Sequence, residues 1–476
     1  MTETGNVRIE HDLLGNRELS SAAYYGVHTL RAVENFPITG QAIASCPELI
    51  RALAGIKKAA ALSNCELGVL SPERSAAICQ ACDEVLAGRW HDQFVVDVIQ
   101  GGAGTSTNMN ANEVIANRAL ELMGHAKGQF QYLHPNEHVN FGQSTNDVYP
   151  TAVKVALWHD THCFLEAMSH LRGALSSKAE AFQAFLKMGR TQLQDAVPMT
   201  LGQEFHTYVV MLQADEAVVR AAQELLCEIN LGGTAIGTGI TAHPDYAALV
   251  TRRLREITGM PVFGAADLIC ATQDCGAFVS LSGALKRAAS RLSKISNDLR
   301  LLASGPRAGF QEIELPAVQA GSSIMPGKVN PVIPEVVNQV AFEVIGNDVT
   351  VTMAAEAGQL QLNAFEPVIA HALFKSLHHL TRACRVLADA CVSGITADRI
   401  QLRNTVVHSV GIVTALNPYI GYANATEIAQ AAFHNGSSVY DEALARGLLT
   451  REQLDEILQP ETLTRPAPLD HELLRD

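Results

Sequence analysis

The sequence has no long apolar run and no basic block, and its first 12 residues lead us to expect no secretory leader. A membrane-spanning helix needs roughly 18 apolar residues in succession, and a secretory leader places a basic region before an apolar one; the sequence offers neither. Lys and Arg total 35 against 49 Asp and Glu, a formal net charge of -14 over 476 residues. Nucleic-acid binders usually carry a basic patch or stripe. We therefore expect a cytoplasmic protein whose partners include neither a membrane nor a nucleic acid.

The 10 cysteines are scattered along the chain, a pattern typical of reduced thiols rather than of a disulfide framework. Cys79 and Cys82 form a lone CxxC pair. No second pair completes a zinc set, and residues 71–88 have the pattern of an amphipathic helix. We interpret both cysteines as core residues of that helix and expect no metal site.

Hydrophobic residues make up 47% of the chain and charged residues 18%, enough to bury sizeable cores in the two or three domains that this length favours. Strand-like alternation is sparse, so we expect a mainly α protein. Residues 1–143 mix short helical stretches with Gly- and Asn-rich loops, residues 144–397 form long proline-poor helical stretches, and residues 398–476 form a smaller helical tail. We predict an N-terminal, a central and a C-terminal domain with these bounds.

The clearest helical pattern begins near Leu268 and contains a heptad stripe. Its apolar residues recur at steps of four and three, which favours near-parallel packing of long helices: Leu281, Leu285, Ala288, Leu292, Ile295, Leu299 and Leu302. Similar stretches cover residues 198–230, 334–365 and 367–394. Helices of about 30 residues are ~45 Å long, and a single layer of five would expose much apolar surface. Copies that share their long helices in a homo-oligomer would cover it; a thick monomeric bundle is the alternative.

Three loops interrupt the helical pattern with glycine, small hydroxyl and amide residues: 101–108, 142–147 and 320–331. Such loops offer many hydrogen-bond donors and little negative charge, which suits a carboxylate or a phosphate. An acidic chain repels a dianion at long range, so the site needs local positive charge, and Lys328 supplies it in the third loop. The three loops predict a composite anion site, although any one of them alone could be a capped turn.

No segment of the sequence has the residue spacing that nucleotide-binding or hydrolase motifs require. Residues 321–328 have five rather than four residues between the glycines of a Walker A loop, and Val329 replaces its Ser or Thr. Residues 231–240 are rich in glycine but lack GxGxxG spacing. No GxSxG elbow brackets Ser322 or Ser323, and none of the 17 histidines lies in an HExxH motif.

Residues 320–331 (AGSSIMPGKVNP) closely resemble the signature loop of the fumarase/aspartase superfamily. Other blocks resemble that family in its order: 100–119, 134–152, 189–205 and 231–240. The resemblance runs from about residue 8 to residue 422, nearly the whole chain. It implies a three-domain, mainly α fold in which the central long-helix bundles of four copies form a 20-helix core. It also implies a homotetramer with shared active sites and a small dicarboxylate as substrate.

The details resemble the aspartase branch of this family more than the fumarase branch. Fumarases carry a GRTH motif whose histidine takes part in handling water, and the matching residue here is Gln192. Expelling hydroxide calls for a proton donor, whereas an ammonium group leaves as neutral ammonia. The resemblance therefore implies a carbon–nitrogen lyase that converts L-aspartate to fumarate and ammonia by Cβ proton abstraction through an aci-carboxylate. A fumarate hydratase and a non-catalytic structural member of the superfamily are the alternatives.

The same resemblance implies roles for individual residues. Ser322 resembles the catalytic base, and Lys328 resembles the residue that stabilises its oxyanion. The remaining matched positions resemble substrate-binding groups: Thr105, Ser144, Thr145 and Ser323 for the aci-carboxylate, Thr191, Lys328 and Asn330 for the α-carboxylate, Asn146 and Gln192 for the amino group, and Arg31 as a further positive contact.

The sequence differs from the family pattern at Ala423 and resembles a fumarase feature at His134. Ala423 stands where the family commonly has glutamate, which weakens what the resemblance implies for the C-terminal domain. His134 resembles part of a second anion site of fumarases. The resemblance implies no cofactor. Some aspartases are activated by divalent cations, and no ligand cluster in this sequence decides that point.

Overall fold

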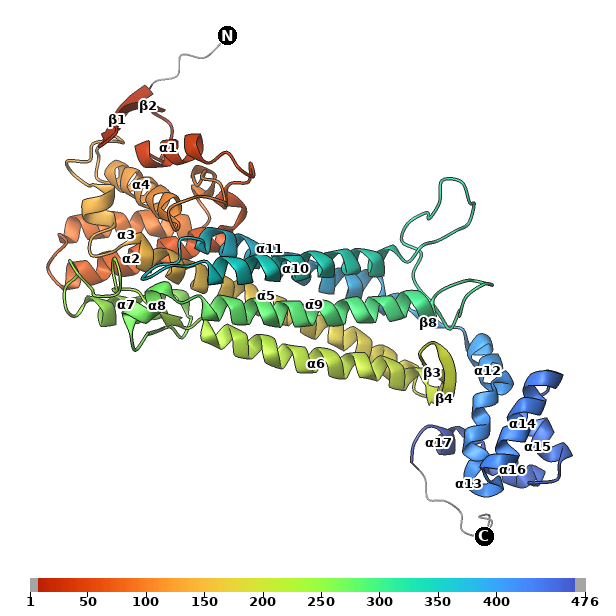
Figure 1. Ribbon diagram of the computed structural model, residues 1–476. Helices are drawn as coiled ribbons and strands as arrows, with labels where there is room; N and C mark the ends of the chain where they lie inside the picture. Colours follow the sequence, from red (N-terminus) through yellow and green to blue (C-terminus); the bar gives the residue numbers. More distant parts are fainter. Residues whose placement is uncertain (1–6, 467–476) are drawn as a thin grey trace. The chain divides into compact units, whose positions relative to one another are not determined.

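The structure is a computed structural model that describes residues 7–466 (Figure 1). About 62% of the chain is helical, which confirms the mainly α prediction. Among these residues the strands form four two-stranded sheets. Among residues 7–466 no helix is both long enough and apolar enough to cross a membrane.

The chain divides into two compact units. Unit 1 holds the described residues up to Glu166, together with Asp215–Ala289 and Ala341–Thr381. Unit 2 holds Ala167–Ala214, Ser290–Val340 and the described residues from Arg382 onward. The three-domain division of the sequence stays a prediction.

Five long helices carry the central part of the chain, as the periodicity predicts. They are α5 (Thr145–Ala181), α6 (Leu201–Leu225), α9 (Gly276–Leu302), α10 (Val332–Glu356) and α11 (Glu366–Ala390). All seven members of the heptad stripe on α9 are buried, none more than 5% exposed. The stripe therefore faces the core, as expected.

Short helices and strands make up the rest of unit 1. They are β1 (Val7–Asp12), β2 (Gly15–Ser20), α1 (Val27–Asn35), α2 (Pro47–Glu66), α3 (Pro72–Leu86), α4 (Thr105–Leu122), a π-helical turn (Pro135–Val139), β5 (Glu228–Ile229), α7 (Tyr246–Thr258), β6 (Phe263–Gly264) and α8 (Leu268–Gln273). Helix α3 matches the helix predicted around Cys79 and Cys82, and Cys82 is fully buried. Burial raises the pKa of both thiols.

Unit 2 adds two short sheets and a helical C-terminal cluster. Its elements are β3 (Leu186–Thr191), β4 (Gln194–Thr200), β7 (Ile313–Glu314), β8 (Thr396–Ala397), α12 (Arg399–His408), α13 (Asn417–Ile420), α14 (Tyr422–Asn435), α15 (Val439–Ala445), α16 (Arg451–Ile457) and α17 (Pro460–Leu463). The cluster has a core of its own, which includes Leu416, Ile428 and Leu454.

Polar cross-links join neighbouring long helices within each unit. In unit 1, the Asp348 carboxylate of α10 accepts hydrogen bonds from Ser282 Oγ (2.8 Å) and Lys286 Nζ (2.6 Å) of α9. In unit 2, Asn338 Nδ2 of α10 donates to Ser293 Oγ of α9 at 2.8 Å. Such bonds are buried or partly buried, so they favour one register between helices that an apolar stripe alone would hold loosely.

The stretch that begins near Leu268 is two helices rather than one. The Asp267 carboxylate caps α8 by accepting from the backbone N–H groups of Ile269 (2.8 Å) and Cys270 (3.0 Å). Asp274 then adopts an extended backbone, and its carboxylate accepts from Gly276 N–H (3.1 Å) at the start of α9. Each aspartate starts a helix because it satisfies N–H groups that have no partner inside the helix.

The buried stripe of α9 predicts a matched pair of outcomes. Leu299 is fully buried and Leu301 is 37% exposed. Leu299→Ala should lower the free energy of unfolding by about 2–5 kcal/mol, since it removes apolar contacts and leaves a cavity. Leu301→Ala should cost less than about 1 kcal/mol. Denaturant midpoints of the two variants measure the difference, and equal losses would contradict the packing described.

Candidate active site

Two helix N-termini meet in unit 1 and bring together two of the predicted loops. Gly104, which precedes α4, has φ +88°, and a Cβ there would lie 2.3 Å from Cγ of Tyr149 in α5. One turn further on, Asn108 Nδ2 donates to Thr145 Oγ1 at 3.1 Å. Glycine is required at 104 by both the backbone angle and the close approach. The hydroxyl-bearing starts of α4 (Thr105) and α5 (Thr145) therefore lie side by side.

The start of α5 is a reciprocal cap. Ser144 Oγ accepts from Asn146 N–H at 3.2 Å, and Asp147 Oδ1 accepts from Ser144 N–H at 2.9 Å. This is the arrangement that a Ser followed three residues later by an acidic residue favours. Because Ser144 Oγ acts as an acceptor here, its hydrogen is free to point toward a ligand.

The other oxygen of Asp147 binds the glycine-rich loop 231–240. Asp147 Oδ2 accepts from Gly232 N–H and Thr234 N–H, both at 3.0 Å. Burial raises the pKa of Asp147 to about 6, while its three backbone hydrogen bonds act in the opposite direction. The fully buried carboxylate thus fastens loop 231–240 to the start of α5.

Pro150 lies inside α5 and leaves a carbonyl without its helical partner. The carbonyl four residues earlier belongs to Asn146, and it accepts from Asn230 Nδ2 at 3.0 Å. The Asn146 side chain in turn donates to the carbonyl of Ala235 at 2.7 Å. The proline is therefore tolerated because Asn230 replaces the missing hydrogen bond.

A buried lysine network lies beside these residues, and sequence reasoning missed it. Lys57 of α2 is fully buried and donates to Asn140 Oδ1 (2.8 Å) and Gln143 Oε1 (2.9 Å). Asn140 Oδ1 also accepts from Asn108 Nδ2 at 3.2 Å. Burial lowers the pKa of Lys57 to about 7, and the nearby charge of Asp147 raises it. One signal was available: two lysines interrupt the otherwise apolar stretch 52–62, so one of them had to lie on its buried face.

Thr105, Ser144 and Thr145 place three hydroxyls at the starts of α4 and α5. The hydroxyls differ in whether they donate or accept hydrogen bonds within the protein. Thr145 and Ser144 accept from protein groups, whereas Thr105 Oγ1 donates to the carbonyl of Gly102 at 2.7 Å. Thr105 is exposed, and Ser144 and Thr145 are partly exposed. Hydroxyl donors at two positive helix ends can bind a carboxylate.

In unit 2, the loop 320–331 presents Ser322 with its oxygen already hydrogen-bonded. Ser322 Oγ accepts from the backbone N–H groups of Met325 (2.9 Å) and Ile324 (3.3 Å). Donors that bind an oxygen favour its ionised form. Lys328 lies six residues later, is exposed, and makes no ion pair with the described part of the chain.

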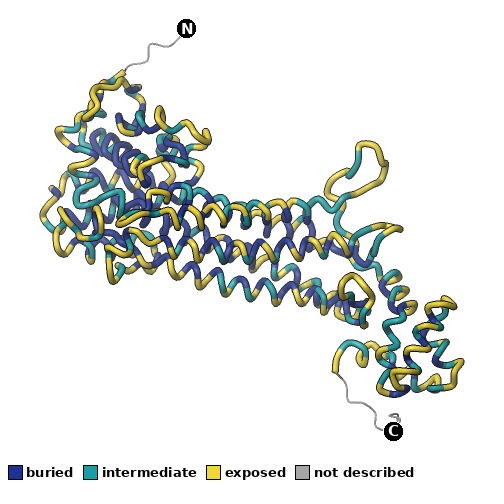
Figure 2. The backbone as a smooth tube through the Cα atoms, in the orientation of Figure 1, coloured by how far each residue is buried: buried dark blue, intermediate teal, exposed yellow. Residues whose placement is uncertain are grey.

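The base of this loop is closed by a close backbone approach. A Cβ at Gly321 would lie 2.2 Å from the carbonyl oxygen of Lys328, and Asn330 Nδ2 donates to the carbonyl of Gly321 at 2.7 Å. Residues 323–329 between these anchors are all exposed (Figure 2). The loop is fastened at its ends, with Ser323 and Lys328 on its open part.

Thr191 and Gln192 lie at the tip of the β3–β4 hairpin, a feature the sequence did not predict. Thr191 pairs with Gln194, so Gln192 and Leu193 form the two-residue turn, with φ +54° and +63°. Such turns favour Asn-Gly, and non-glycine residues there are strained. The tip is exposed, and Leu193 is 62% exposed. Strain of this kind is more frequent at functional sites than elsewhere.

Arg31 of α1 is held by a neighbouring carboxylate. Its Nε and Nη2 donate to Asp12 Oδ2 and Oδ1, both at 2.8 Å, and Nη2 also donates to the carbonyl of Gly15. This bidentate pair lowers the pKa of Asp12. In this arrangement the guanidinium is already bound to Asp12 and Gly15 rather than directed at a substrate.

The predicted site residues therefore fall into separate groups. Unit 1 brings together Thr105, Ser144, Thr145 and Asn146, and unit 2 holds Ser322, Ser323, Lys328 and Asn330 on one loop and Thr191 and Gln192 on a hairpin. Within residues 7–466 no three His, Cys, Asp or Glu side chains are grouped to hold a metal ion.

The buried lysine predicts a pH effect with a defined sign. With a pKa of about 7 in the folded state and 10.5 as its ordinary value, Lys57 must lose a proton on folding between those pH values. The unfolded chain binds more protons there, so stability rises with pH by up to about 1.4 kcal/mol per pH unit. The midpoint difference, the thermal midpoint of the wild type minus that of Lys57→Met, should therefore increase from pH 7 to pH 9.5.

The neighbouring lysine provides the control. Lys58 is ion-paired with Asp83 at 2.5 Å and is not fully buried. The midpoint difference between the wild type and Lys58→Met should stay nearly constant over the same pH range. A constant difference for Lys57→Met as well would mean that Lys57 folds in its charged form.

Comparisons with known proteins identify the family of the chain. A family model described as "Lyase" matches residues 15–346, and one described as "Fumarase C C-terminus" matches residues 412–465. The chain is 57% identical to aspartate ammonia-lyase of Helicobacter pylori (97% of this chain, 98% of the relative). It is 56% identical to aspartate ammonia-lyase of Escherichia coli (98% of this chain, 97% of the relative).

Solved structures show the same fold. A fumarate lyase:delta crystallin from Brucella melitensis, bound to cobalt, superposes with a TM-score of 0.95 at 52% identity (97% of this chain, all of that chain). A class II fumarase from Schistosoma mansoni superposes with a TM-score of 0.92 at 36% identity (96% and 98%). These findings confirm the predicted superfamily and fold. The chain belongs to the lyase family that includes aspartate ammonia-lyase and class II fumarase, and it is an enzyme of the carbon–nitrogen lyase class.

Proposed function

We propose that the protein catalyses the reversible elimination of ammonia from L-aspartate to give fumarate. The base removes a proton from Cβ, and the electron pair of that C–H bond passes into the adjacent carboxylate, which becomes a doubly charged aci-carboxylate. The pair then returns to form the Cα=Cβ double bond while the C–N bond breaks. Its electrons leave with nitrogen, and the ammonium group departs as neutral ammonia.

Ser322 is the proposed base. A serine hydroxyl is normally a poor base, so its alkoxide needs stabilisation. Support comes from the two backbone N–H groups that donate to its oxygen, from Ile324 and Met325, and from the cationic Lys328 on the same loop. This hydrogen-bonded Ser322 is the single observation that carries the mechanistic proposal.

The aci-carboxylate is the high-energy species, and hydroxyl donors aimed at it supply the main stabilisation. We assign this role to Thr105, Ser144, Thr145 and Ser323. Thr145 Oγ1 accepts from Asn108, so its hydrogen is available to the substrate. Thr105 now donates to the carbonyl of Gly102 and would exchange that acceptor for the substrate oxygen.

The other end of the substrate needs a positive clamp. We assign the α-carboxylate to Thr191, Lys328 and Asn330, and the amino group to Asn146 and Gln192. Gln192 fits an ammonia-lyase because the leaving ammonia needs no proton donor. Arg31 is the weakest assignment, since its guanidinium would have to share its charge with Asp12. We propose that no cofactor takes part, since Ser322 and the donors account for every proton and charge in the scheme.

We propose further that the active sites are shared between the copies of a homotetramer. Support comes from the exposed apolar residues of α10. Phe342 (62% exposed), Val349 (55%) and Met353 (66%) follow one another at steps of seven and four, so they lie along one side of the helix. Exposed apolar stripes of this kind usually mark an interface with another protein chain.

A paired substrate assay tests the reaction. With L-aspartate the purified protein should release fumarate, followed by its absorbance in the ultraviolet, and ammonia in equal amounts. With L-malate, the fumarase substrate, fumarate should form at least about 100-fold more slowly, since a site built for one leaving group discriminates strongly. Fumarate from malate without deamination of aspartate would make the protein a hydratase, the alternative that the Schistosoma fumarase structure favours.

The proposed base predicts a graded result for neighbouring serines. Ser322→Ala should lower kcat by about 1,000-fold or more, because it removes the proton acceptor, while succinate, an unreactive dicarboxylate, should bind with nearly unchanged affinity. Ser323→Ala should lower kcat on the order of 100-fold, as expected for a single lost donor. Near-normal turnover by Ser322→Ala would exclude that serine as the base.

The shared-site proposal predicts the mass in solution. Light scattering during size exclusion should give the mass of four chains of 51.1 kDa each. Phe342→Glu should dissociate this tetramer, since an unpaired charge cannot be buried in the interface without a large cost. Phe433→Glu, at a phenylalanine of α14 that is also exposed (75%), should leave the tetramer intact. A fully active species with the mass of one chain would contradict the proposal.

A further inference from the structure

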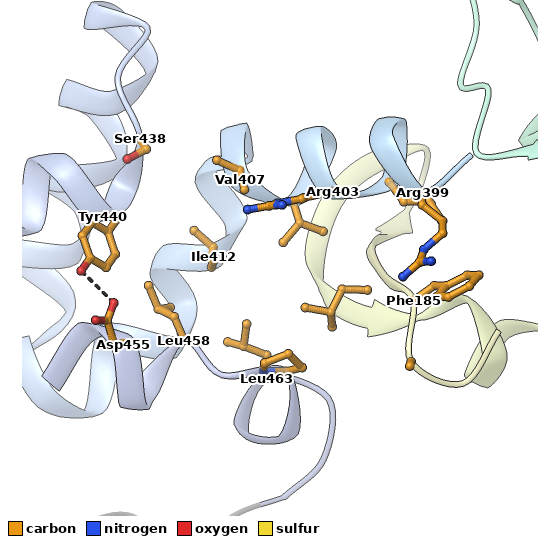
Figure 3. A pocket seen from close by; sticks show the side chains of 15 residues that line it. Phe185, Arg399, Arg403, Val407, Ile412, Ser438, Tyr440, Asp455, Leu458 and Leu463 are labelled. Atoms are coloured by element: carbon orange, nitrogen blue, oxygen red, sulfur yellow. Dashed lines mark hydrogen bonds between the residues drawn. The ribbon is translucent and has the colours of Figure 1, made fainter. Parts of the chain in front are cut away.

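A cavity of about 710 Å³ lies entirely within unit 2 (Figure 3). Its walls come from α12, from residues 184–186 at the start of β3, and from the C-terminal segments that carry Tyr440, Leu458 and Leu463. The volume falls within the range of small-molecule sites, roughly 300–1,000 Å³. None of the residues assigned to the lyase reaction lines it.

Most of the cavity wall is apolar. Leu402 and Val406 of α12 are buried lining residues, and Ile412, Leu458 and Leu463 line the wall formed by the chain beyond α12. Such a surface favours a hydrocarbon body, since each buried methylene contributes about 0.8 kcal/mol. A four-carbon dicarboxylate offers too little apolar surface to use it.

Two arginines line the same cavity from one side. Arg399 and Arg403 are four residues apart on α12, so their side chains lie on one face of the helix. The Arg399 guanidinium lies over the ring of Phe185, 4.7 Å from its centroid. Figure 3 shows Arg403 extending away from Arg399 along the cavity. Among residues 7–466 neither guanidinium has a carboxylate partner, although acidic residues outnumber basic ones by 49 to 35.

Among the described lining residues, Asp455 is the one carboxylate, and it lies at the opposite wall, where it already accepts a hydrogen bond. Asp455 Oδ1 accepts from the hydroxyl of Tyr440 at 2.8 Å, as Figure 3 shows. Ser438, the other hydroxyl in the lining, donates to Asp441 at 2.8 Å. The described part of the cavity is therefore polarised, with two arginines on α12 that have no carboxylate partner within residues 7–466 and a carboxylate at the far end.

We propose that this cavity is a binding site for an anionic amphiphile, a molecule with one carboxylate or phosphate head on a hydrocarbon body. The head lies at Arg403, whose planar fork matches carboxylate and phosphate oxygens, and Arg399 adds positive charge on the same helix. The hydrocarbon body fills the apolar part of the cavity. Asp455 at the far wall excludes a second anionic group, so the site distinguishes its ligand from the short dicarboxylates of the lyase reaction.

Isothermal titration calorimetry on the purified full-length protein tests the proposal, with decanoate and decyl phosphate as probes, both below their micelle concentrations. At least one of them should bind with a stoichiometry of one per chain, and octanoate should bind about 10-fold more weakly than decanoate because it lacks two methylenes. Decyltrimethylammonium, a cation with the same tail, should not bind. Binding of decanoate would indicate a free carboxylate as the natural head, and binding of decyl phosphate alone a phosphate.

Variants separate the cavity from nonspecific binding. Arg403→Gln should weaken the probe about 10-fold or more, the loss expected for a charge-assisted pair, and Val407→Trp should block it by filling the cavity. Arg446→Gln, which removes an exposed arginine paired with Glu427 outside the cavity, should bind as the wild type does.

Three results would overturn the proposal. They are the absence of binding by both probes, equal affinity in the wild type, Arg403→Gln and Val407→Trp, and competition by succinate as effective as that by octanoate. The experiment measures binding at a site remote in sequence from Ser322. These results therefore test only the proposed cavity site and not the proposed lyase function.

Discussion

A single buried carboxylate determines how the start of α5 is built. Asp147 accepts hydrogen bonds from Ser144 on its own helix and from Gly232 and Thr234 on the glycine-rich loop. An unpaired carboxylate could not be buried there, so these backbone groups have to converge on it. Their convergence fixes Ser144 and Thr145 at the positive end of α5, next to the start of α4 and Thr105. The hydroxyls that could bind a carboxylate are thus held by rigid elements rather than by loop side chains alone.

The loop that carries Ser322 has the opposite character. It is anchored at Gly321 and Asn330, and residues 323–329 between them are exposed. A base on an exposed loop can act on a substrate only when another surface covers it, because water weakens the electrostatic stabilisation of its alkoxide. This need for a cover, together with the exposed apolar side of α10, gives the shared-site proposal its physical basis. A binding surface on one copy and a reactive loop on another would meet only in the assembled protein.

Periodicity predicted the long helices because a heptad stripe is a local pattern that leaves only one side of the helix suited to burial. All seven stripe residues of α9 are buried. It did not predict the break at Asp274, where capping by two aspartates outweighs continuous apolar spacing. The hairpin tip at Gln192 was missed because its positive φ values contradict the preferences of Gln and Leu. The Lys57 network was missed because Asn108, Asn140 and Gln143 come together only in the folded chain. The site residues themselves came from family resemblance, since no spacing rule connects residues 105, 144, 191 and 322.

Activity of mixed assemblies tests the central claim most directly. Ser322→Ala and Ser144→Ala, each inactive or nearly so alone, are unfolded together, refolded as a mixture, and assayed for fumarate release from L-aspartate. If Ser144 and Ser322 of one site come from different chains, some sites in the hybrids contain both wild-type serines, and activity returns to a sizeable fraction of the wild-type value. If both serines of a site come from one chain, every site keeps a defect and the mixture stays as inactive as its parents, which would contradict the account.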